Sequence, residues 1–495
     1  MSQSNRGWLD QILAWFSGSR TTQPSTPPAP PQPVQPPNDQ EKPPMQPERN
    51  WTILLYMAGD NGKVFETKHG AYALMAEMTS AGYTDIAEVE AVGTTDQVAV
   101  LAQFDTSGAD GTYRLEIHKG KTAQENIVET IPESNTGDPA ELAKFIVWGM
   151  TRCPAKHTMV VLWNHGLGWK DDDIYQSVRG LSRTVRSGGR GRVQNAAMFR
   201  STAVVVKQLA DDEGDEEARG ILCDDTSMDF LTNAEMSQAL KVAMFAQDET
   251  DAAAIFADAA RLASVMETGN EGALRRLAVI GMDACLMAML EVQYQVRQFA
   301  DVLVSSQEVE PIDGWPYSEI LERLAANPSA SPADFSKIIV EEYERFYFSK
   351  NTTLSAVDLG TMAEVRRLVS DFAAALDAAY PGDDSLQLAY AKAVKENRRT
   401  FEDQEYLDLL VLANGILTRY DGSVPDVAAT GKALADYLQA ADGPVVINAA
   451  TGSKKDKASG ISIYVPFDQP SPLYQEIDFA SAGWLTFLKT VYDTV

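Results

Sequence analysis

Short apolar stretches separated by helical patterns are the feature that most constrains the fold of this chain. The clearest of them are Trp51–Met57, Val98–Asp105, Thr158–Trp163 and Leu277–Met282. Each is long enough for one strand and carries few polar residues, so both of its faces must be covered. Strands of this kind form parallel sheets that are packed between helices. The pattern therefore predicts an α/β fold with a mostly parallel central sheet.

Helix start signals mark several of the segments between these strands. Asp138 followed by Pro139 predicts a helix that runs to about Met150, because proline fits the first turn of a helix. Thr232, with Glu235 three residues later, forms a capping box and predicts a second helix start. The last third of the chain is mostly helical in pattern, so we expect a largely helical C-terminal portion.

The first 49 residues differ from the rest in composition. Residues 1–20 hold a short apolar stripe interrupted by polar residues, which predicts a short amphipathic helix and not a secretory signal. Residues 21–49 contain eleven of the 24 prolines and predict a disordered linker. We expect a folded core at residues 50–380 and a subdomain at residues 381–495 that packs on it.

A strongly charged segment at residues 171–219 interrupts the pattern of strands and helices. It begins with three aspartates and ends in a run of acidic residues. Its centre is rich in glycine and carries Arg179, Arg183, Arg186, Arg190, Arg192 and Arg200. Such a composition cannot build a core, so we expect an exposed loop.

Charge and cysteine content exclude several classes of protein. The chain has 42 Lys and Arg residues against 70 Asp and Glu residues, a formal net charge of −28. So acidic a surface repels the phosphate backbone, which argues against nucleic-acid binding. Three cysteines in 495 residues cannot form a disulfide framework. The cysteines and histidines are not spaced closely enough to predict a structural zinc site. With no signal and no apolar run of membrane-spanning length, we expect a cytoplasmic protein.

A histidine and a cysteine follow two of the predicted strands at their carboxyl ends: His165 and Cys285. Sites in open α/β sheets form at this edge, so the two side chains can face each other. A nearby imidazole lowers the pKa of a thiol or accepts its proton, which makes the cysteine a nucleophile. A helix predicted from about Leu286 would favour the thiolate through its dipole. Gly166 has no Cβ to obstruct an oxyanion, so its N–H and that of Cys285 are natural oxyanion donors.

The same residues also fit a purely structural interpretation. A lone cysteine at the end of a buried strand is often inert packing, and a lone histidine is often a hydrogen-bonded structural residue. Cys153 and Cys223 have no evident histidine partner in the sequence, and we expect them to be structural. Considered alone, the residues leave both interpretations open.

The segments around both residues resemble those of a known family. They are WNHGLGW at residues 163–169, IGMDACLMAMLEV at residues 280–292 and SSQEVEPIDGWPY at residues 305–317. The chain resembles the clostripain-like cysteine peptidases, peptidase family C11, in the clan with the caspase-type fold. The likeness runs from about residue 50 to the C-terminus outside the charged loop, and includes WTILLYMAGDN, SNTGDPAEL, TLSAVDL and GISIYVPF. The caspase motif QACRG is absent, so the caspase motifs cannot be used to assign residues in this sequence.

The resemblance implies a caspase-like α/β/α sandwich and a bacterial cysteine endopeptidase with His165 and Cys285 as its dyad. It also implies that Asp283 lies in the S1 pocket and selects Arg or Lys at P1, so the partner is a protein or peptide substrate with a basic P1 residue. A carboxylate can bind a guanidinium through two hydrogen bonds, which agrees with this role. Asp283 could instead cap the helix predicted after Cys285.

Glu308, Asp313 and Trp315 follow a predicted strand and are candidates for the substrate groove. The two acids could equally be solvated, and the tryptophan could belong to the core. No cofactor is required and no metal ligand is assigned. Some relatives require calcium, so calcium is a candidate cofactor by resemblance. The sequence itself contains no EF-hand loop that would predict it. The acidic runs at residues 171–173 and 211–217 could bind calcium loosely or be ordinary solvated charge.

The arginine-rich loop predicts self-processing. An enzyme that cuts after Arg would meet its own loop at high effective concentration, and a flexible backbone can adopt the extended form that a protease groove requires. Caspase-fold enzymes resemble this design when they mature by cutting between the segments that carry His and Cys. The alternative is a tolerated surface insertion.

A different class of function is an interaction protein on the same fold, in which proteolysis is regulated or secondary. Residues 1–20 and the linker would then dock a partner. Docking to a protein fits better than membrane binding, because residues 1–20 carry only Arg6 and Arg20 as cationic anchors. The presence of both His165 and Cys285 favours the peptidase.

Overall fold

The computed structural model describes most of the chain that follows the proline-rich segment. The described residues are 49–60, 66–67, 70–71, 77–107, 111–170, 221–224, 226–227 and 229–494. Glu48–Val495 forms one compact unit. The predicted helix at residues 1–20, the linker up to residue 48 and the charged loop lie outside the described residues. They stay predictions, as does the subdomain boundary at residue 381.

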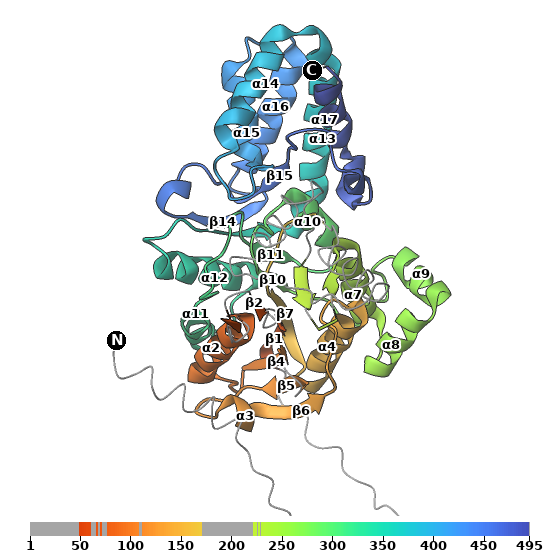
Figure 1. Cartoon of the computed structure of the whole chain (residues 1–495), viewed down its shortest axis with the longest axis vertical. Coiled ribbons are helices and arrows are strands. Elements are labelled where there is room, and N and C mark those ends of the chain that lie inside the picture. The colour runs from red at the N-terminus through yellow and green to blue at the C-terminus, as the bar shows by residue number, and fades with distance from the viewer. Residues whose placement is uncertain are drawn as a thin grey trace, which may run out of the picture. The chain divides into compact units, whose positions relative to one another are not determined.

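A nine-stranded sheet forms the centre of the fold in the described part of the chain (Figure 1). From one edge its strands are β14 (Val445–Ala450), β12 (Thr353–Asp358), β11 (Val302–Ser305), β10 (Val279–Asp283), β7 (Ala155–Trp163), β1 (Arg49–Gly59), β4 (Val98–Thr106), β5 (Thr112–Glu116) and β6 (Ile127–Ile131). The strands from β11 to β4 are parallel, and the pairs at both edges are antiparallel. The predicted α/β fold with a largely parallel centre is confirmed.

Helices cover both faces of this sheet (Figure 1). On one side lie α2 (Glu77–Val92), α11 (Tyr317–Ala326) and α12 (Pro332–Phe346). On the other lie α4 (Pro139–Arg152), α7 (Asn233–Phe245), α8 (Glu249–Ala257) and α9 (Ala259–Glu267). The short α3 (Ala123–Asn126) connects β5 to β6. This arrangement is an α/β/α sandwich.

The C-terminal portion is largely helical, as predicted. Its helices are α13 (Met362–Ala379), α14 (Asp384–Asn397), α15 (Leu409–Arg419), α16 (Pro425–Leu438) and α17 (Trp484–Asp493). Small strand pairs complete the described chain: β2 (Glu66–Thr67) with β3 (Gly70–Ala71), β8 (Ile221–Asp224) with β9 (Asp229–Leu231), and β13 (Tyr406–Asp408) with β15 (Ser462–Tyr464). Because β14 pairs with β12, the C-terminal portion also supplies one edge of the central sheet.

The predicted helix starts at Asp138 and Thr232 are confirmed. The Asp138 side chain accepts a hydrogen bond from Ala140 N, and Pro139 is the first residue of α4. Thr232 and Glu235 form the reciprocal capping box at the start of α7. In both cases a short polar side chain satisfies an N–H group that has no partner inside the helix.

The helix predicted from about Leu286 is wrong in its start, because α10 spans Leu290–Val296. Leu286 has a φ of 63°, in the left-handed region. Its N–H donates to Glu308 O at 3.1 Å, and Ala288 N donates to Ser306 O at 2.8 Å. These N–H groups bond to the segment after β11, so residues 285–289 form an irregular loop in place of a first helical turn.

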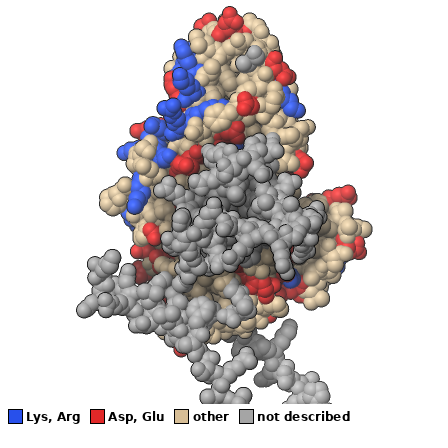
Figure 2. All heavy atoms as spheres, in the orientation of Figure 1, with Lys and Arg blue, Asp and Glu red and all other residues tan. Residues whose placement is uncertain are grey.

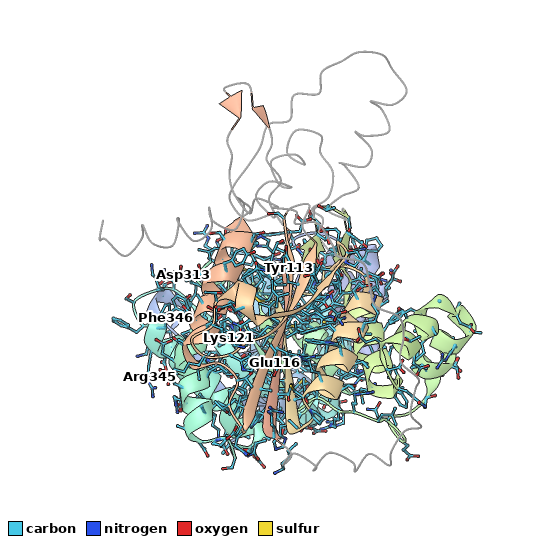
Figure 3. All side chains as sticks on the ribbon, turned by 90° about the horizontal axis from the view of Figure 1, so that it is seen from below. Tyr113, Glu116, Lys121, Asp313, Arg345 and Phe346 are labelled. Carbon is cyan, nitrogen blue, oxygen red and sulfur yellow. The ribbon has the colours of Figure 1, made fainter. Side chains whose placement is uncertain are left out.

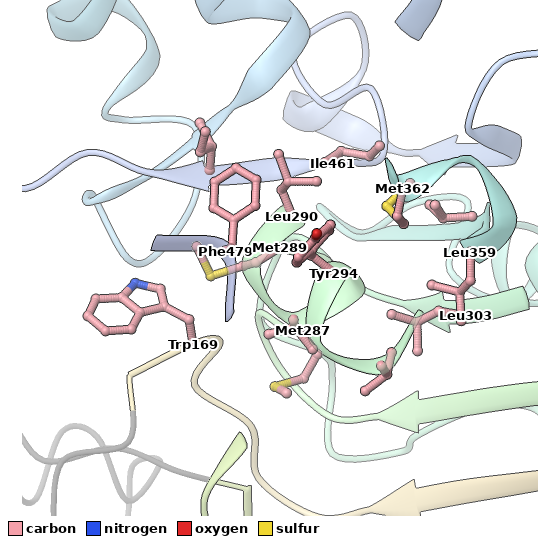
Figure 4. Packing of buried hydrophobic residues seen from close by; sticks show 14 of the residues in the cluster. Trp169, Met287, Met289, Leu290, Tyr294, Leu303, Leu359, Met362, Ile461 and Phe479 are labelled. Carbon is pink, nitrogen blue, oxygen red and sulfur yellow. The ribbon is translucent and has the colours of Figure 1, made fainter. Parts of the chain in front are cut away.

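Apolar side chains that follow Cys285 anchor this loop in the hydrophobic core (Figure 4). Met287, Met289 and Leu290 are fully buried. They belong to the same cluster as Trp169, which lies shortly after β7. The loop that carries the predicted nucleophile is therefore held by packing on its C-terminal side.

Candidate active site

The strands that precede His165 and Cys285 are neighbours in the sheet. β7 and β10 are parallel, with Trp163 paired to Asp283. The register continues one residue further, since Asn164 N donates to Asp283 O at 3.3 Å. His165 and Cys285 each lie two residues beyond the last strand pair. The fold thus places both at one edge of the sheet, on adjoining loops.

Gly166 fixes how closely these two loops approach. A Cβ on Gly166 would lie 2.6 Å from the carbonyl oxygen of Cys285 and 2.8 Å from Ala284 Cβ. Only a residue without a side chain fits this contact. His165 and Cys285 are both half-buried, so a substrate can reach them while the backbones pack together.

Asn164 holds the histidine loop in place, a role that sequence reasoning missed. Its side chain is buried and its amide N–H donates to Ala58 O, at the end of β1. Its Oδ1 accepts a hydrogen bond from Cys223 N, in β8, at 3.0 Å. The residue next to His165 thus connects three strands.

The Cys285 thiol lies in an environment that disfavours the thiolate. Burial raises the pKa of Cys285 to about 11, and the nearby charges of Glu308 and Asp283 also favour the thiol. A hydrogen bond from Glu310 N to Sγ, at 3.2 Å, opposes this effect in part. The prediction that a helix dipole favours the thiolate is wrong. The helix α10 begins only at Leu290, and a helix dipole acts only over the first turn.

Asp283 does not cap a helix but faces the loop that leads to α11. It is 5% exposed, and its Oδ2 accepts hydrogen bonds from Trp315 N at 3.2 Å and from the Tyr317 hydroxyl at 2.8 Å. Burial raises the pKa of Asp283. The carboxylate is thus oriented by donors on the neighbouring loop.

A second buried carboxylate, that of Asp85 in α2, lies on the same side of the loop that leads to α11 as Asp283 does. Trp163 Nε1 donates to its Oδ2 at 2.6 Å. A Cβ on Gly314 would lie 3.2 Å from Oδ2 of Asp85 and 3.2 Å from Oδ2 of Asp283, so the two acids converge. Burial raises the pKa of Asp85, and repulsion from Asp283 raises it further. A cation would relieve this repulsion.

The family is shown by comparison with known proteins. The model of the clostripain family, peptidase C11, matches residues 74–188 and 208–488. The chain belongs to the clostripain family. This clostripain-family chain is a cysteine peptidase, as its sequence predicted.

Solved structures of C11 proteases share the fold of this clostripain-family chain. One is a secreted C11 cysteine protease from Bacteroides thetaiotaomicron bound to an irreversible peptide inhibitor, with a TM-score of 0.50 and 17% identity over 88% of this chain and 99% of that one. An inactive zymogen C11 protease from Parabacteroides distasonis has a TM-score of 0.52 at the same identity and coverage. No curated protein matches the sequence.

The predicted cytoplasmic location is wrong. Structural neighbours of this clostripain-family chain from B. thetaiotaomicron are secreted C11 proteases. The prediction relied on the lack of a recognisable secretory signal in residues 1–20 and of a membrane-spanning apolar run, and neither observation determines where a protein acts. Among the described helices, none has both the length and the apolar surface needed to cross a membrane.

The three groove candidates of this clostripain-family chain occupy different environments. Glu308 is buried, pairs with Lys454, and accepts a hydrogen bond from Glu402 N at 3.1 Å. Trp315 is 1% exposed and packs under Gly281 of β10. Asp313 is exposed at the periphery (Figure 3). Only Asp313 is open to solvent.

The other two cysteines of this clostripain-family chain, Cys153 and Cys223, are buried and form no disulfide in the described part of the chain. Cysteine peptidases generally need no cofactor for their chemistry. The acidic runs considered for calcium lie in the loop outside the described residues.

A hollow of about 440 Å³ lies in the C-terminal helical portion, apart from the strand ends. Its lining includes Tyr390, Lys395, Arg398 and Tyr492. On the face shown in Figure 2, Lys and Arg side chains gather along one edge of this portion, at the upper left. No residue assigned above to the site lines this hollow.

Proposed function

We propose that this chain is an endopeptidase that cleaves after Arg or Lys, with Cys285 as the nucleophile and His165 as its base. The observation that carries the proposal is the contact of Gly166 with the Cys285 carbonyl, where β7 and β10 end side by side. A histidine and a cysteine on such adjoining loops can form a nucleophile–base pair. Hydrolysis of a peptide with Arg at P1 by the parent protein, and its loss in Cys285→Ala, tests the proposal.

The reaction has two halves. His165 accepts the thiol proton as Cys285 Sγ bonds to the substrate carbonyl carbon, whose oxygen becomes an oxyanion. The C–N bond then breaks, and His165 gives the proton to the leaving amine. In the second half His165 takes a proton from water, whose oxygen attacks the thioester. The acid product leaves, and the thiol is restored.

The proposed oxyanion donors are the backbone N–H groups of Gly166 and Cys285. Neither donates a hydrogen bond to another residue in the described part of the chain. Two such donors on facing loops would stabilise the negative oxygen of the tetrahedral intermediate.

Asp283 is the proposed partner of the P1 cation, and Asp85 adds negative charge beside it. Both carboxylates are buried, and neither forms an ion pair with a Lys or Arg among the described residues. A guanidinium or ammonium group placed between them would supply the missing positive charge. Its N–H groups would donate hydrogen bonds to the carboxylate oxygens, which would orient it. This arrangement supports a preference for Arg or Lys.

We expect Cys285 to be a protonated thiol in the free enzyme at neutral pH. Its pKa lies near 11 because of burial and of the neighbouring Glu308 and Asp283. Since only the thiolate reacts with iodoacetamide, the alkylation rate of Cys285 should rise about tenfold per pH unit from roughly pH 7 to roughly pH 10. Peptide mapping after timed alkylation measures this rate. A rate that is already level at neutral pH would reveal a preformed thiolate–imidazolium pair and contradict the expectation.

Self-processing of the charged loop is the second part of the proposal. The described chain stops at Lys170, seven residues after β7, and resumes at Ile221, the first residue of β8. The arginine-rich segment is therefore joined at both ends to parts of the chain that lie near His165, since Cys223 of β8 donates to Asn164. We expect the active parent to be cut after one of Arg179, Arg183, Arg186, Arg190, Arg192 or Arg200. The two fragments should stay associated, because both contribute strands to one sheet.

Intact mass and a denaturing gel of the parent beside Cys285→Ala check the processing. Two fragments in the parent and one chain in Cys285→Ala are the expected result. An active parent that remains one full-length chain would show that no cut is needed. The same cut in Cys285→Ala would assign it to another protease.

A further inference from the structure

The hollow in the C-terminal helical portion is lined by residues of α14, of α17 and of the segment that follows β15. At about 440 Å³ it is large enough for a small molecule, since ligand sites measure about 300–1,000 Å³. Its wall combines aromatic rings with cations. The rings belong to Tyr380, Tyr390, Phe467 and Tyr492, and the cations to Lys395, Arg398 and Arg399. None of these residues belongs to the proposed dyad or P1 pocket.

Helix α14 supplies one side of this wall. Tyr390, Val394 and Arg398 follow one another at intervals of four residues, so they lie along one face of the helix. Tyr390 is only 3% exposed, whereas Lys395 and Arg399 are exposed. The hollow therefore has an aromatic, buried side and an open side that carries positive charge.

Arg398 is held in the wall by neutral groups. Its guanidinium donates to Gln404 O at 3.1 Å, to Val465 O at 3.0 Å and to Pro466 O at 2.5 Å. It also lies 4.1 Å from the centroid of the Phe467 ring, in a cation–π contact. Carbonyl groups fix the guanidinium without cancelling its charge, so this charge can still attract an anion.

The three cations of the hollow lack an acidic partner. In the described part of the chain, Lys395, Arg398 and Arg399 form no ion pair with Asp or Glu. Their neighbour Arg419, by contrast, pairs with Glu396. Cations at the end of a helix also stabilise its dipole, which by itself would explain their place after α14. The case for a ligand therefore needs a further observation.

The hydroxyl of Tyr390 is that observation. Its oxygen is fully buried and has no hydrogen-bond partner among the described residues. Burial raises the pKa of Tyr390, the neighbouring Tyr492 and Tyr380 raise it further, and Arg398 lowers it. Because these three neighbours all line the hollow, the hydroxyl lies beside it. A buried hydroxyl without a partner is unfavourable, and a hydrogen-bond acceptor on a ligand would relieve it.

We propose that the hollow binds a small amphipathic carboxylate, an organic acid with an apolar ring system. The carboxylate would accept hydrogen bonds from Lys395 and Arg399 at the open side. The ring system would pack on Tyr390 and Phe467, and an acceptor on it would meet the Tyr390 hydroxyl. A small inorganic anion would leave the aromatic wall uncovered, and an uncharged apolar molecule would leave the cations without a partner.

Fluorescence titration of the full-length Cys285→Ala protein with dansylglycine and dansylamide tests the charge requirement. The two probes share a ring system and a sulfonyl acceptor, but only dansylglycine carries a carboxylate. We expect saturable binding of both, at least about fivefold tighter for dansylglycine. The double variant Lys395→Gln, Arg399→Gln should lose this preference. The matched double variant Arg367→Gln, Lys432→Gln, which removes exposed cations from α13 and α16, should keep it.

Two further variants locate the binding in the hollow. Tyr390→Phe removes one oxygen, so both probes should bind at least about threefold more weakly. Without a probe this variant should unfold at the temperature of its parent or higher, because it lacks the unpaired hydroxyl. Ala391→Trp, at an exposed position of the lining, should fill the hollow and abolish binding of both probes. Equal affinity of the parent for the two probes, no saturable binding, or binding that survives Ala391→Trp would overturn the proposal.

Discussion

Cys285→Ala and His165→Ala should each lower peptide hydrolysis by about 10⁴–10⁶-fold while the fold stays intact. Members of one catalytic unit show losses of this size, because removal of either one disables the whole transfer. The two residues lie on loops that contact each other through Gly166, so neither substitution disturbs the packed strands beneath. Initial rates on one peptide with Arg at P1, together with thermal unfolding of each variant, provide the measurement.

Cys153→Ala and Cys223→Ala are the matched controls, since both cysteines are buried and neither forms a disulfide with another described residue. Each should keep its turnover once any loss of stability is taken into account. Full activity in Cys285→Ala would remove Cys285 from the mechanism. A folded but inactive Cys223→Ala would move the nucleophile to that residue.

Asp283→Asn should lose most of the preference for Arg and Lys at P1. A buried charge that is left without its partner costs about 2–5 kcal/mol, or some tens- to thousands-fold in kcat/KM. The amide keeps the shape of the side chain and its acceptor for Trp315 N and the Tyr317 hydroxyl. The ratio of kcat/KM for Arg to that for Leu at P1, in parent and variant, is the quantity to compare.

Two comparisons make this prediction specific. Alkylation of Cys285 by iodoacetamide should persist in Asp283→Asn, since a small thiol reagent needs no P1 pocket. Asp371→Asn removes an exposed charge on α13 and should leave the ratio as in the parent. An unchanged Arg-to-Leu ratio in Asp283→Asn would assign specificity elsewhere, with Asp85 as the next carboxylate to substitute.

Local patterns in the sequence predict much of this fold. Wholly apolar strands and capping residues such as Asp138 and Thr232 depend on neighbours within a few residues, so they can be recognised without the structure. The positions of His165 and Cys285 follow from one further rule, that parallel strands end at the same edge. The α/β class, the parallel centre of the sheet and the helical C-terminal portion were predictable on these grounds.

Contacts between distant segments were not predictable in the same way. The loop after Cys285 bonds to Glu308 and Ser306, which overrides the helical pattern until Leu290. Asp85 reaches Asp283 from a helix almost 200 residues earlier in the chain, and only the packing of α2 beside α11 brings them together.

The most direct measurement of the central claim is kcat/KM on four fluorogenic peptides that differ only at P1, with Arg, Lys, Leu or Asp, using the parent beside Cys285→Ala. The parent should cleave after Arg and Lys at least about tenfold faster than after Leu, with the slowest cleavage after Asp, whose charge the buried acids repel. Cys285→Ala should cleave none of them. Equal cleavage after Arg and Leu by the parent, or cleavage by Cys285→Ala, would contradict the account.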